Sequence, residues 1–102
     1  MYICKVKATS NWSKLEDLIK ALEGMSDFSF DADTRYQIQA EGLISILRLC
    51  DNTSAPTDSL EGNYIVGSQP AFYKKSTGRD LYVRADVGNI DSMLIKVSSV
   101  GE

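Results

Sequence analysis

The stretch Leu81-Tyr82-Val83-Arg84-Ala85-Asp86-Val87 decides the fold class, because its side chains alternate strictly between apolar and polar. Successive side chains of a strand point to opposite faces of a sheet, so a period of two predicts a strand with one packed and one wet face. We expect the apolar members of this stretch to face a core and Tyr82, Arg84 and Asp86 to face outward. A half-buried sheet therefore forms the basis of the predicted fold.

Similar patterns extend from this stretch in both directions. The predicted strands cover 2–8, 35–40, 43–50, 62–67, 70–74, 81–87 and 91–97. Pro70 is typical of an edge strand or of the first residue of a strand, and Gly78 is typical of a hairpin turn. We interpret 26–33 as a loop or short edge strand, and we expect 98–102 to fray. About five to seven short strands separated by turns predict a mainly β fold, an antiparallel β-sandwich or small barrel.

One amphipathic helix is predicted near the N-terminus. Its apolar stripe has helical spacing and consists of Trp12, Leu15, Leu18, Ile19 and Leu22. Ser10 or Asn11 is the expected N-cap, and Gly24 the expected stop. Trp12 is interpreted as the first core anchor of this helix rather than as a ligand-stacking residue.

The chain has 102 residues, which predicts a single domain over 1–102. Within it, 1–24 supply a strand plus the helix, and 34–98 supply the β-sandwich. The longest strongly apolar run, 43–50, is far shorter than the roughly 20 residues of a membrane-spanning helix. We expect no secretion signal and no membrane partner.

Charge and composition exclude several functions. The net charge is −3, which argues against a nucleic-acid partner, since such domains are usually basic. The chain has no histidine, so a Ser-His or Cys-His nucleophile within it is excluded. We predict that the protein is not an enzyme and has no catalytic residues. A carboxylate-based hydrolase is the enzymatic alternative, although no carboxylate pair can be assigned from spacing.

No metal or cofactor site is predicted. Asp27, Asp31 and Asp33 form an acidic cluster that could attract calcium, but the spacing lacks the glycine and late glutamate of an EF-hand, and a solvated loop is the preferred interpretation. Cys4 and Cys50 form no C-x-x-C motif, and we expect two reduced core thiols, with a disulfide as the alternative.

Basic and aromatic residues alternate around the predicted hairpin at 74–84. Lys74, Lys75, Arg79 and Arg84 occur there with Tyr73 and Tyr82. This combination can bind nucleic acid or an anionic sugar, but a solvated hairpin face is the preferred interpretation at this net charge. Tyr and Arg are also enriched at protein interfaces. The predicted interface residues are therefore Tyr64, Tyr73, Tyr82 and Arg84.

The second part of the chain resembles the small all-β modules of tailed-bacteriophage virion proteins, which occur in tail, fibre, decoration and head-to-tail components. The resemblance spans 36–97, and 1–24 lie outside the pattern. The residues that carry it are Tyr36-Gln37-Ile38-Gln39, Pro56, Gly62-Asn63-Tyr64-Ile65-Val66, Phe72-Tyr73 and Asp80-Leu81-Tyr82-Val83-Arg84-Ala85. It implies a structural or adsorption role in an oligomer without an active site, and it assigns no individual functional residue.

The expected function is thus that of a non-enzymatic virion structural protein, associated with the tail or capsid. It would be made in the cytoplasm of the host bacterium and would assemble with copies of itself and with other virion proteins through strand faces and edges. The alternative is a binding module for a carbohydrate or a host surface glycan, which would require exposed, coplanar aromatic rings in a shallow groove.

Overall fold

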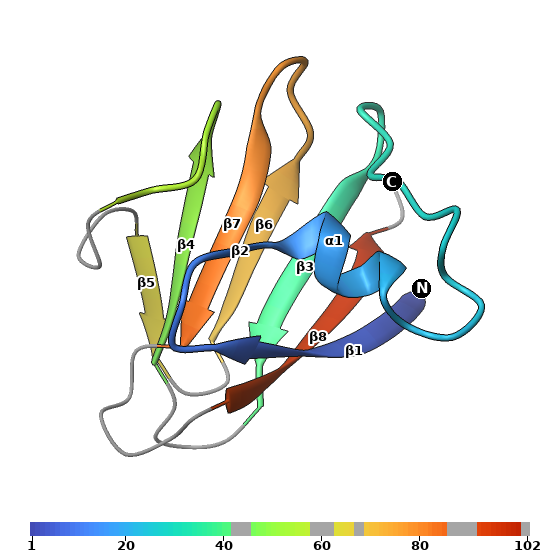
Figure 1. Ribbon diagram of the computed structural model, residues 1–102. Coiled ribbons are helices and arrows are strands. Elements are labelled where there is room, and N and C mark those ends of the chain that lie inside the picture. Colours follow the sequence, from blue (N-terminus) through green and yellow to red (C-terminus); the bar gives the residue numbers. More distant parts are fainter. Residues whose placement is uncertain (42–45, 58–62, 67–68, 86–91, 101–102) are drawn as a thin grey trace.

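The computed structural model describes residues 1–41, 46–57, 63–66, 69–85 and 92–100 (Figure 1). These residues form a mainly β structure with one short helix. The elements in chain order are β1 (Tyr2–Thr9), β2 (Ser13–Lys14), α1 (Leu15–Lys20), β3 (Arg35–Ala40), β4 (Ile46–Asn52), β5 (Asn63–Val66), β6 (Pro70–Lys74), β7 (Asp80–Ala85) and β8 (Ser92–Val100).

The strands form two antiparallel sheets of four strands each. Sheet A has the order β1-β8-β3-β6, and sheet B has the order β2-β7-β4-β5. The first and last strands of the chain pair along their length, from Tyr2 opposite Ser98 to Thr9 opposite Ser92. The mainly β prediction is therefore confirmed, and β6 lies at the edge of sheet A, as Pro70 indicated.

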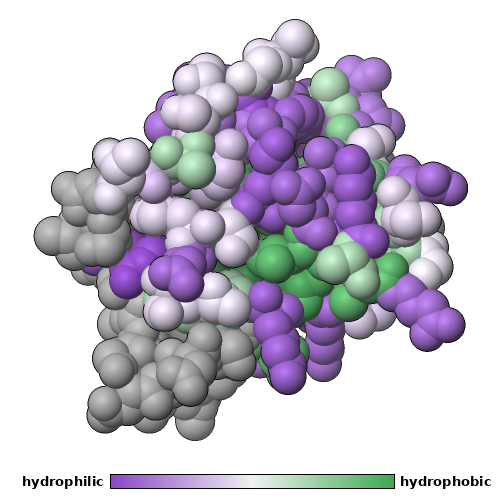
Figure 2. Space-filling view, in the orientation of Figure 1, coloured by the Kyte–Doolittle hydropathy of each residue, from purple (hydrophilic) through white to green (hydrophobic). Residues whose placement is uncertain are grey.

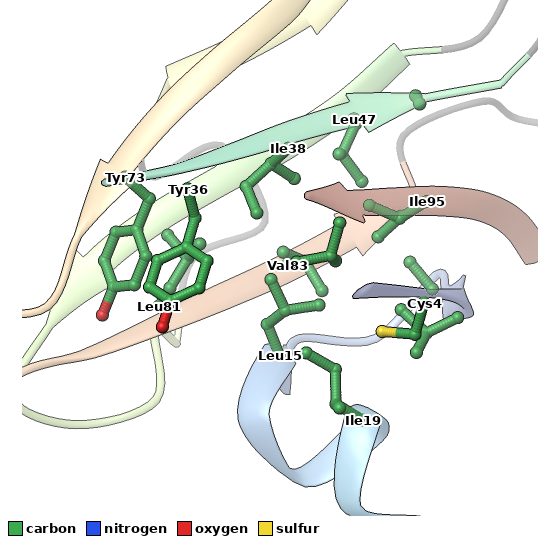
Figure 3. Close-up of a cluster of buried hydrophobic side chains, with 14 of the residues drawn as sticks. Cys4, Leu15, Ile19, Tyr36, Ile38, Leu47, Tyr73, Leu81, Val83 and Ile95 are labelled. Carbon is green, nitrogen blue, oxygen red and sulfur yellow. The ribbon is translucent and has the colours of Figure 1, made fainter. Parts of the chain in front are cut away.

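Both sheets and α1 contribute to one hydrophobic core. Its largest fully buried side chains are Leu15, Ile19, Ile38, Leu47, Val83, Ile95 and Val97. Figure 3 shows Ile38 and Ile95 of sheet A, Leu47 and Val83 of sheet B, and Leu15 and Ile19 of α1 in one continuous cluster. The alternating apolar residues of the predicted strands thus supply the core, because each strand turns the same parity of side chain inward.

The helix is shorter than its apolar stripe predicted. It begins at Leu15, because Ser13 and Lys14 pair with Val83 and Tyr82 of β7 as the short strand β2. The N-cap is Lys14 without a side-chain hydrogen bond, so the predicted caps Ser10 and Asn11 were wrong. The helix ends at Lys20 with Ala21 as its C-cap, so the predicted stop at Gly24 was wrong, although Gly24 has a φ of +79° in the turn that follows.

Trp12 lies before the helix and outside the core cluster, so its interpretation as a core anchor was wrong. Leu18, Leu22 and Met25 are only partly buried against the core. Figure 2 shows a hydrophobic patch, bordered by hydrophilic side chains, on the side of the molecule that carries α1. Among the described residues, no helix is long and apolar enough to cross a membrane.

The C-terminal residues were expected to fray, but they extend β8 to Val100. Ser99 N–H donates to the Met1 carbonyl over 2.7 Å, and Val100 lies opposite Arg35 of β3. These pairings on both sides hold the end of β8 in place. The predicted strand residues 43–45, 62, 67, 86–87 and 91, and residues 101–102 of the end that was expected to fray, lie outside the described residues.

Candidate interaction surface

Three of the four predicted interface residues lie on sheet B, where Tyr64 and Arg84 flank Arg48 in one cross-strand row, whereas Tyr73 lies on sheet A. Tyr73 belongs to β6 of sheet A and is buried in the core, with only 7% of its surface exposed. Tyr82 and Arg84 belong to β7 of sheet B, and Tyr64 lies on β5, opposite Arg48 of β4, with its side chain outside the described residues. Because Tyr73 is buried in the core, it is not available on an exposed surface, whereas Tyr82 and Arg84 lie on one strand of sheet B.

Tyr82 was expected to face solvent, but it is also only 7% exposed. The register places it between Lys14 of β2 and Cys50 of β4, so neighbouring strands flank it on both sides. The alternation correctly predicted that Tyr82 points to the side of the sheet opposite Leu81 and Val83, because Tyr82 is absent from the core cluster that contains them. It did not reveal that β2 extends this sheet and helps to bury the ring.

Three basic residues of the 74–84 hairpin, Lys75, Arg79 and Arg84, are engaged by acceptors nearby. Lys75 Nζ lies 2.8 Å from Asp80 Oδ1, and Arg79 Nε lies 3.5 Å from Asp51 Oδ1. Arg84 Nε donates to the Ser10 carbonyl over 2.8 Å. The turn itself is as predicted, with Gly78 at a φ of +78°. The hairpin is thus largely neutralised by its neighbours and does not form a basic patch.

The acidic cluster is a structured turn. Asp31 Oδ1 accepts a hydrogen bond from Asp33 N–H at 2.9 Å, which satisfies the loop backbone. In the part of the chain that the structure describes, no three His, Cys, Asp or Glu side chains are grouped to hold a metal ion. Cys4 and Cys50 form no disulfide with each other, and burial raises the pKa of Cys4. Only Cys4 belongs to the core, because Cys50 is partly exposed.

Tyr73 contains a buried polar atom without a partner among the described residues. Its hydroxyl is buried, and burial raises the pKa of this phenol well above its usual value. Phe30 packs edge-on against Tyr73 and against Tyr36, with ring centroids 5.2 and 4.9 Å apart. Tyr36, directly opposite Tyr73 in the sheet, accepts a hydrogen bond from Asp31 N–H at 2.8 Å. These rings therefore serve packing rather than ligand binding.

The outward face of sheet A is the surface that stands out. It carries three large hydrophobic side chains that are substantially exposed, Tyr2 at 55%, Phe72 at 51% and Leu94 at 40%. The pairing register aligns Tyr2, Ser98, Gln37 and Phe72 in one row across all four strands. Three strand spacings separate the two rings by about 14 Å. The row thus has an aromatic ring at each end and polar side chains between.

Cations lie on both sides of this aromatic row. Arg35 and Lys74 face each other on one side, and Lys5 and Lys96 face each other on the other. The guanidinium of Arg35 lies 4.2 Å from the centroid of the Phe72 ring, and Lys96 Nζ lies 6.0 Å from that of Tyr2. Such cation–π contacts are worth about 0.5–1 kcal/mol at exposed sites. Each contact holds one cation beside one aromatic ring.

We call this surface the basic face, and it consists of Tyr2, Lys5, Lys7, Arg35, Phe72, Lys74, Leu94 and Lys96. It holds five of the 11 Lys and Arg residues of a chain whose net charge is −3. Its ion pair among the described residues joins Lys5 Nζ to Glu41 Oε1 at 2.7 Å, and the hydrogen bond to Glu41 raises the pKa of Lys5. The face therefore keeps an excess of positive charge.

A cavity of about 270 Å³ adjoins the basic face at the β6 edge. Ile38, Ala71 and Tyr73 of sheet A line it together with Leu49 and Leu81 of sheet B, and Asp51, Phe72 and Lys74 complete its wall. Its lining is mostly apolar, and Phe72 lies both in this wall and on the basic face. The open edge of β6 thus continues the exposed surface of sheet A.

Part of the basic face can be predicted from the sequence. The alternation at 2–8 predicted that Lys5 and Lys7 face solvent, and the patterns at 35–40 and 91–97 place Arg35 and Lys96 at equivalent positions. What it lacked was the strand order, which brings β1, β8, β3 and β6 together from both ends of the chain.

Comparisons with protein-family models, with curated proteins and with solved structures found no match to this chain.

Proposed function

We propose that this protein is a non-enzymatic structural component of a bacteriophage virion, associated with the tail or capsid, that assembles with copies of itself and other virion proteins. We further propose that its two sheets pack as a β-sandwich, with side chains of both inner faces in the shared core. The resemblance of 36–97 to small all-β virion modules supports the virion role. The geometry of the basic face supports assembly.

The observation that carries the proposal is the exposure of Tyr2, Phe72 and Leu94 on one flat sheet face. Tyr2 and Phe72 lie at opposite edges of this face with polar side chains between them, and each ring is accompanied by a cation. Aromatic and Arg side chains are the groups that most often anchor protein interfaces. Arg35 stacked on Phe72 provides one such anchor.

The glycan-binding alternative receives less support. Sugar recognition by stacking needs accessible ring faces, but Arg35 lies over the ring of Phe72 and Lys96 lies over that of Tyr2. The rings are also about 14 Å apart, because two strands separate β1 from β6. A binding test against a glycan array separates this alternative from assembly.

Sedimentation velocity over a wide concentration range tests self-assembly. We expect the protein to associate, and we expect the double variant Tyr2→Ser, Phe72→Ser to raise the dissociation constant at least about tenfold, a loss of roughly 1.4 kcal/mol. Thr53→Ala, an exposed substitution directly after β4 of sheet B, is the control and should leave association unchanged. A wild-type protein that stays monomeric at millimolar concentration would contradict the proposal. Capsid or tail genes beside this one would support the virion role.

A further inference from the structure

Two surfaces of this chain carry charge of opposite sign. The basic face carries Lys5, Lys7, Arg35, Lys74 and Lys96, and among the described residues Glu41 is the carboxylate that pairs with it. The stretch from α1 to β3 has the opposite character, with six carboxylates and the single cation Lys20 over 16–33. Its carboxylates are Glu16, Asp17, Glu23, Asp27, Asp31 and Asp33. We call residues 16–33 the acidic segment.

The acidic segment is held in a defined shape although 21–33 contain no regular element. Glu16 Oε1 accepts a hydrogen bond from Phe30 N–H at 3.1 Å, and Tyr36 Oη accepts one from Asp31 N–H at 2.8 Å. Phe30 is buried in the core between its aromatic neighbours. Figure 1 shows the segment looping out at the side of the molecule between α1 and β3. A pre-organised segment loses little conformational entropy when it binds.

The two surfaces do not neutralise each other within one chain. Glu23, Asp27, Asp31 and Asp33 are exposed, and within the described residues none of them forms an ion pair. The same holds for the cations of the basic face other than Lys5. Each surface therefore keeps its charge available to a partner of opposite sign.

We infer that the basic face of one copy docks the acidic segment of a second copy. This inference rests on the proposed function and names the surfaces that would perform the assembly. Because the contact joins two different surfaces, it is heterologous, and such contacts generate rings when the rotation closes and filaments when it does not. The carboxylates at 27–33 would pair with the unpaired cations of the face, and Tyr2, Phe72 and Leu94 would supply apolar area.

A second copy fits this face better than a single-stranded nucleic acid does. Bases stack on open aromatic rings, but here Arg35 and Lys96 already lie over the two rings. The net charge of −3 also works against a polyanion, whereas a folded partner presents its acidic groups locally. We therefore expect a second copy, and not a nucleic acid, to bind this face, and the experiment below includes a single-stranded DNA probe.

Charge reversal tests the contact from both sides. One variant reverses the face with Lys7→Glu and Lys96→Glu, and the other reverses the segment with Asp27→Lys and Asp33→Lys. All four side chains lack ion pairs within the described structure, so folding should be preserved, which circular dichroism and urea unfolding check. In sedimentation velocity at low salt, each variant alone should associate at least about tenfold more weakly than the wild type. An equimolar mixture should recover association, because each supplies the surface that complements the other.

The outcomes separate the inference from the proposed function. If the wild type associates but both variants associate equally well, the inference fails while assembly stands. If the wild type remains monomeric, self-assembly itself fails, and the inference with it. If fluorescein-labelled dT20 binds the wild type, binding is lost in Lys7→Glu, Lys96→Glu, and self-association is unchanged in that variant, the face is a nucleic-acid surface and the inference is overturned. Association that weakens with each reversal and returns on mixing supports the inference.

Discussion

Aromatic and charged side chains differ in exposure and in pairing between the outward faces of the two sheets. On sheet A, Phe72 is half exposed and the cations outnumber the carboxylates, whereas on sheet B Tyr82 is buried between neighbouring strands. At the same end of sheet B, Asp80 pairs with both Lys14, at 3.4 Å, and Lys75, at 2.8 Å. Sheet B thus satisfies its own polar and aromatic groups, while sheet A leaves them available. This difference is the reason why we propose the outward face of sheet A as the interaction surface.

The largest expected effect separates the two aromatic residues that represent these faces. Tyr82→Ala should lower the free energy of unfolding by about 3 kcal/mol, because it empties a buried site. Phe72→Ala should lower it by less than about 1 kcal/mol, since it removes a half-exposed ring and a cation–π contact. Urea unfolding of the two variants under non-associating conditions measures both. Equal losses would show that the faces do not differ in the way described.

The difference between the two sheets shows which features of the fold could be predicted from the sequence. The pattern at 35–40 predicted β3 with its observed boundaries, because every second residue of that strand is apolar and buried. Pro70 predicted an edge strand or the first residue of a strand from its missing N–H, and it is the first residue of the edge strand β6. Properties that belong to one strand are thus readable from that strand.

Properties that depend on neighbouring strands were not readable. Tyr82 is buried because β2 pairs beside it, and the pattern at 12–22 had assigned those residues to a helix. The basic face requires that β1 and β8, from opposite ends of the chain, lie next to each other and beside β3. Alternation fixes which way a side chain points but not which strands adjoin it. The choice of Tyr73 over Phe72 is a different error, because alternation along β6 itself turns Phe72 outward and Tyr73 inward.

A second comparison concerns the two tyrosines that face each other in the core. Figure 3 shows Tyr36 and Tyr73 side by side with their hydroxyls pointing the same way, yet only Tyr36 has a partner among the described residues. Tyr73→Phe should raise the free energy of unfolding by about 1 kcal/mol, because a buried hydroxyl without a partner is costly. Tyr36→Phe should lower it by about the same amount, because Asp31 N–H loses its acceptor.

Thermal and urea unfolding of both phenylalanine variants measure this pair. The two substitutions remove the same atom from adjacent positions of one sheet, so each is the control for the other. A loss of stability in Tyr73→Phe would show that its hydroxyl has a hydrogen-bond partner after all.

The smallest expected effect concerns pH and the ion pairs that neutralise sheet B. The hydrogen bond from Lys75 lowers the pKa of Asp80, and the charges of Lys75 and Lys14 add to this shift. A carboxyl whose pKa is lower in the folded than in the unfolded state stabilises the fold above its unfolded pKa of about 3.9. That contribution is lost as the pH falls through the folded value, and for a pair near the surface it amounts to under about 1 kcal/mol.

Asp80→Asn should therefore reduce stability slightly at pH 7 and flatten its decline below about pH 4. Urea midpoints measured from pH 7 to pH 2 follow both changes. Asp17→Asn, an exposed carboxyl of α1 without an ion pair among the described residues, is the matched control and should leave the acid decline unchanged. If Asp80→Asn keeps the full acid sensitivity of the wild type, the Lys14–Asp80–Lys75 group does not stabilise sheet B. The contrast between a self-neutralised sheet B and an open sheet A would then rest on Tyr82 alone.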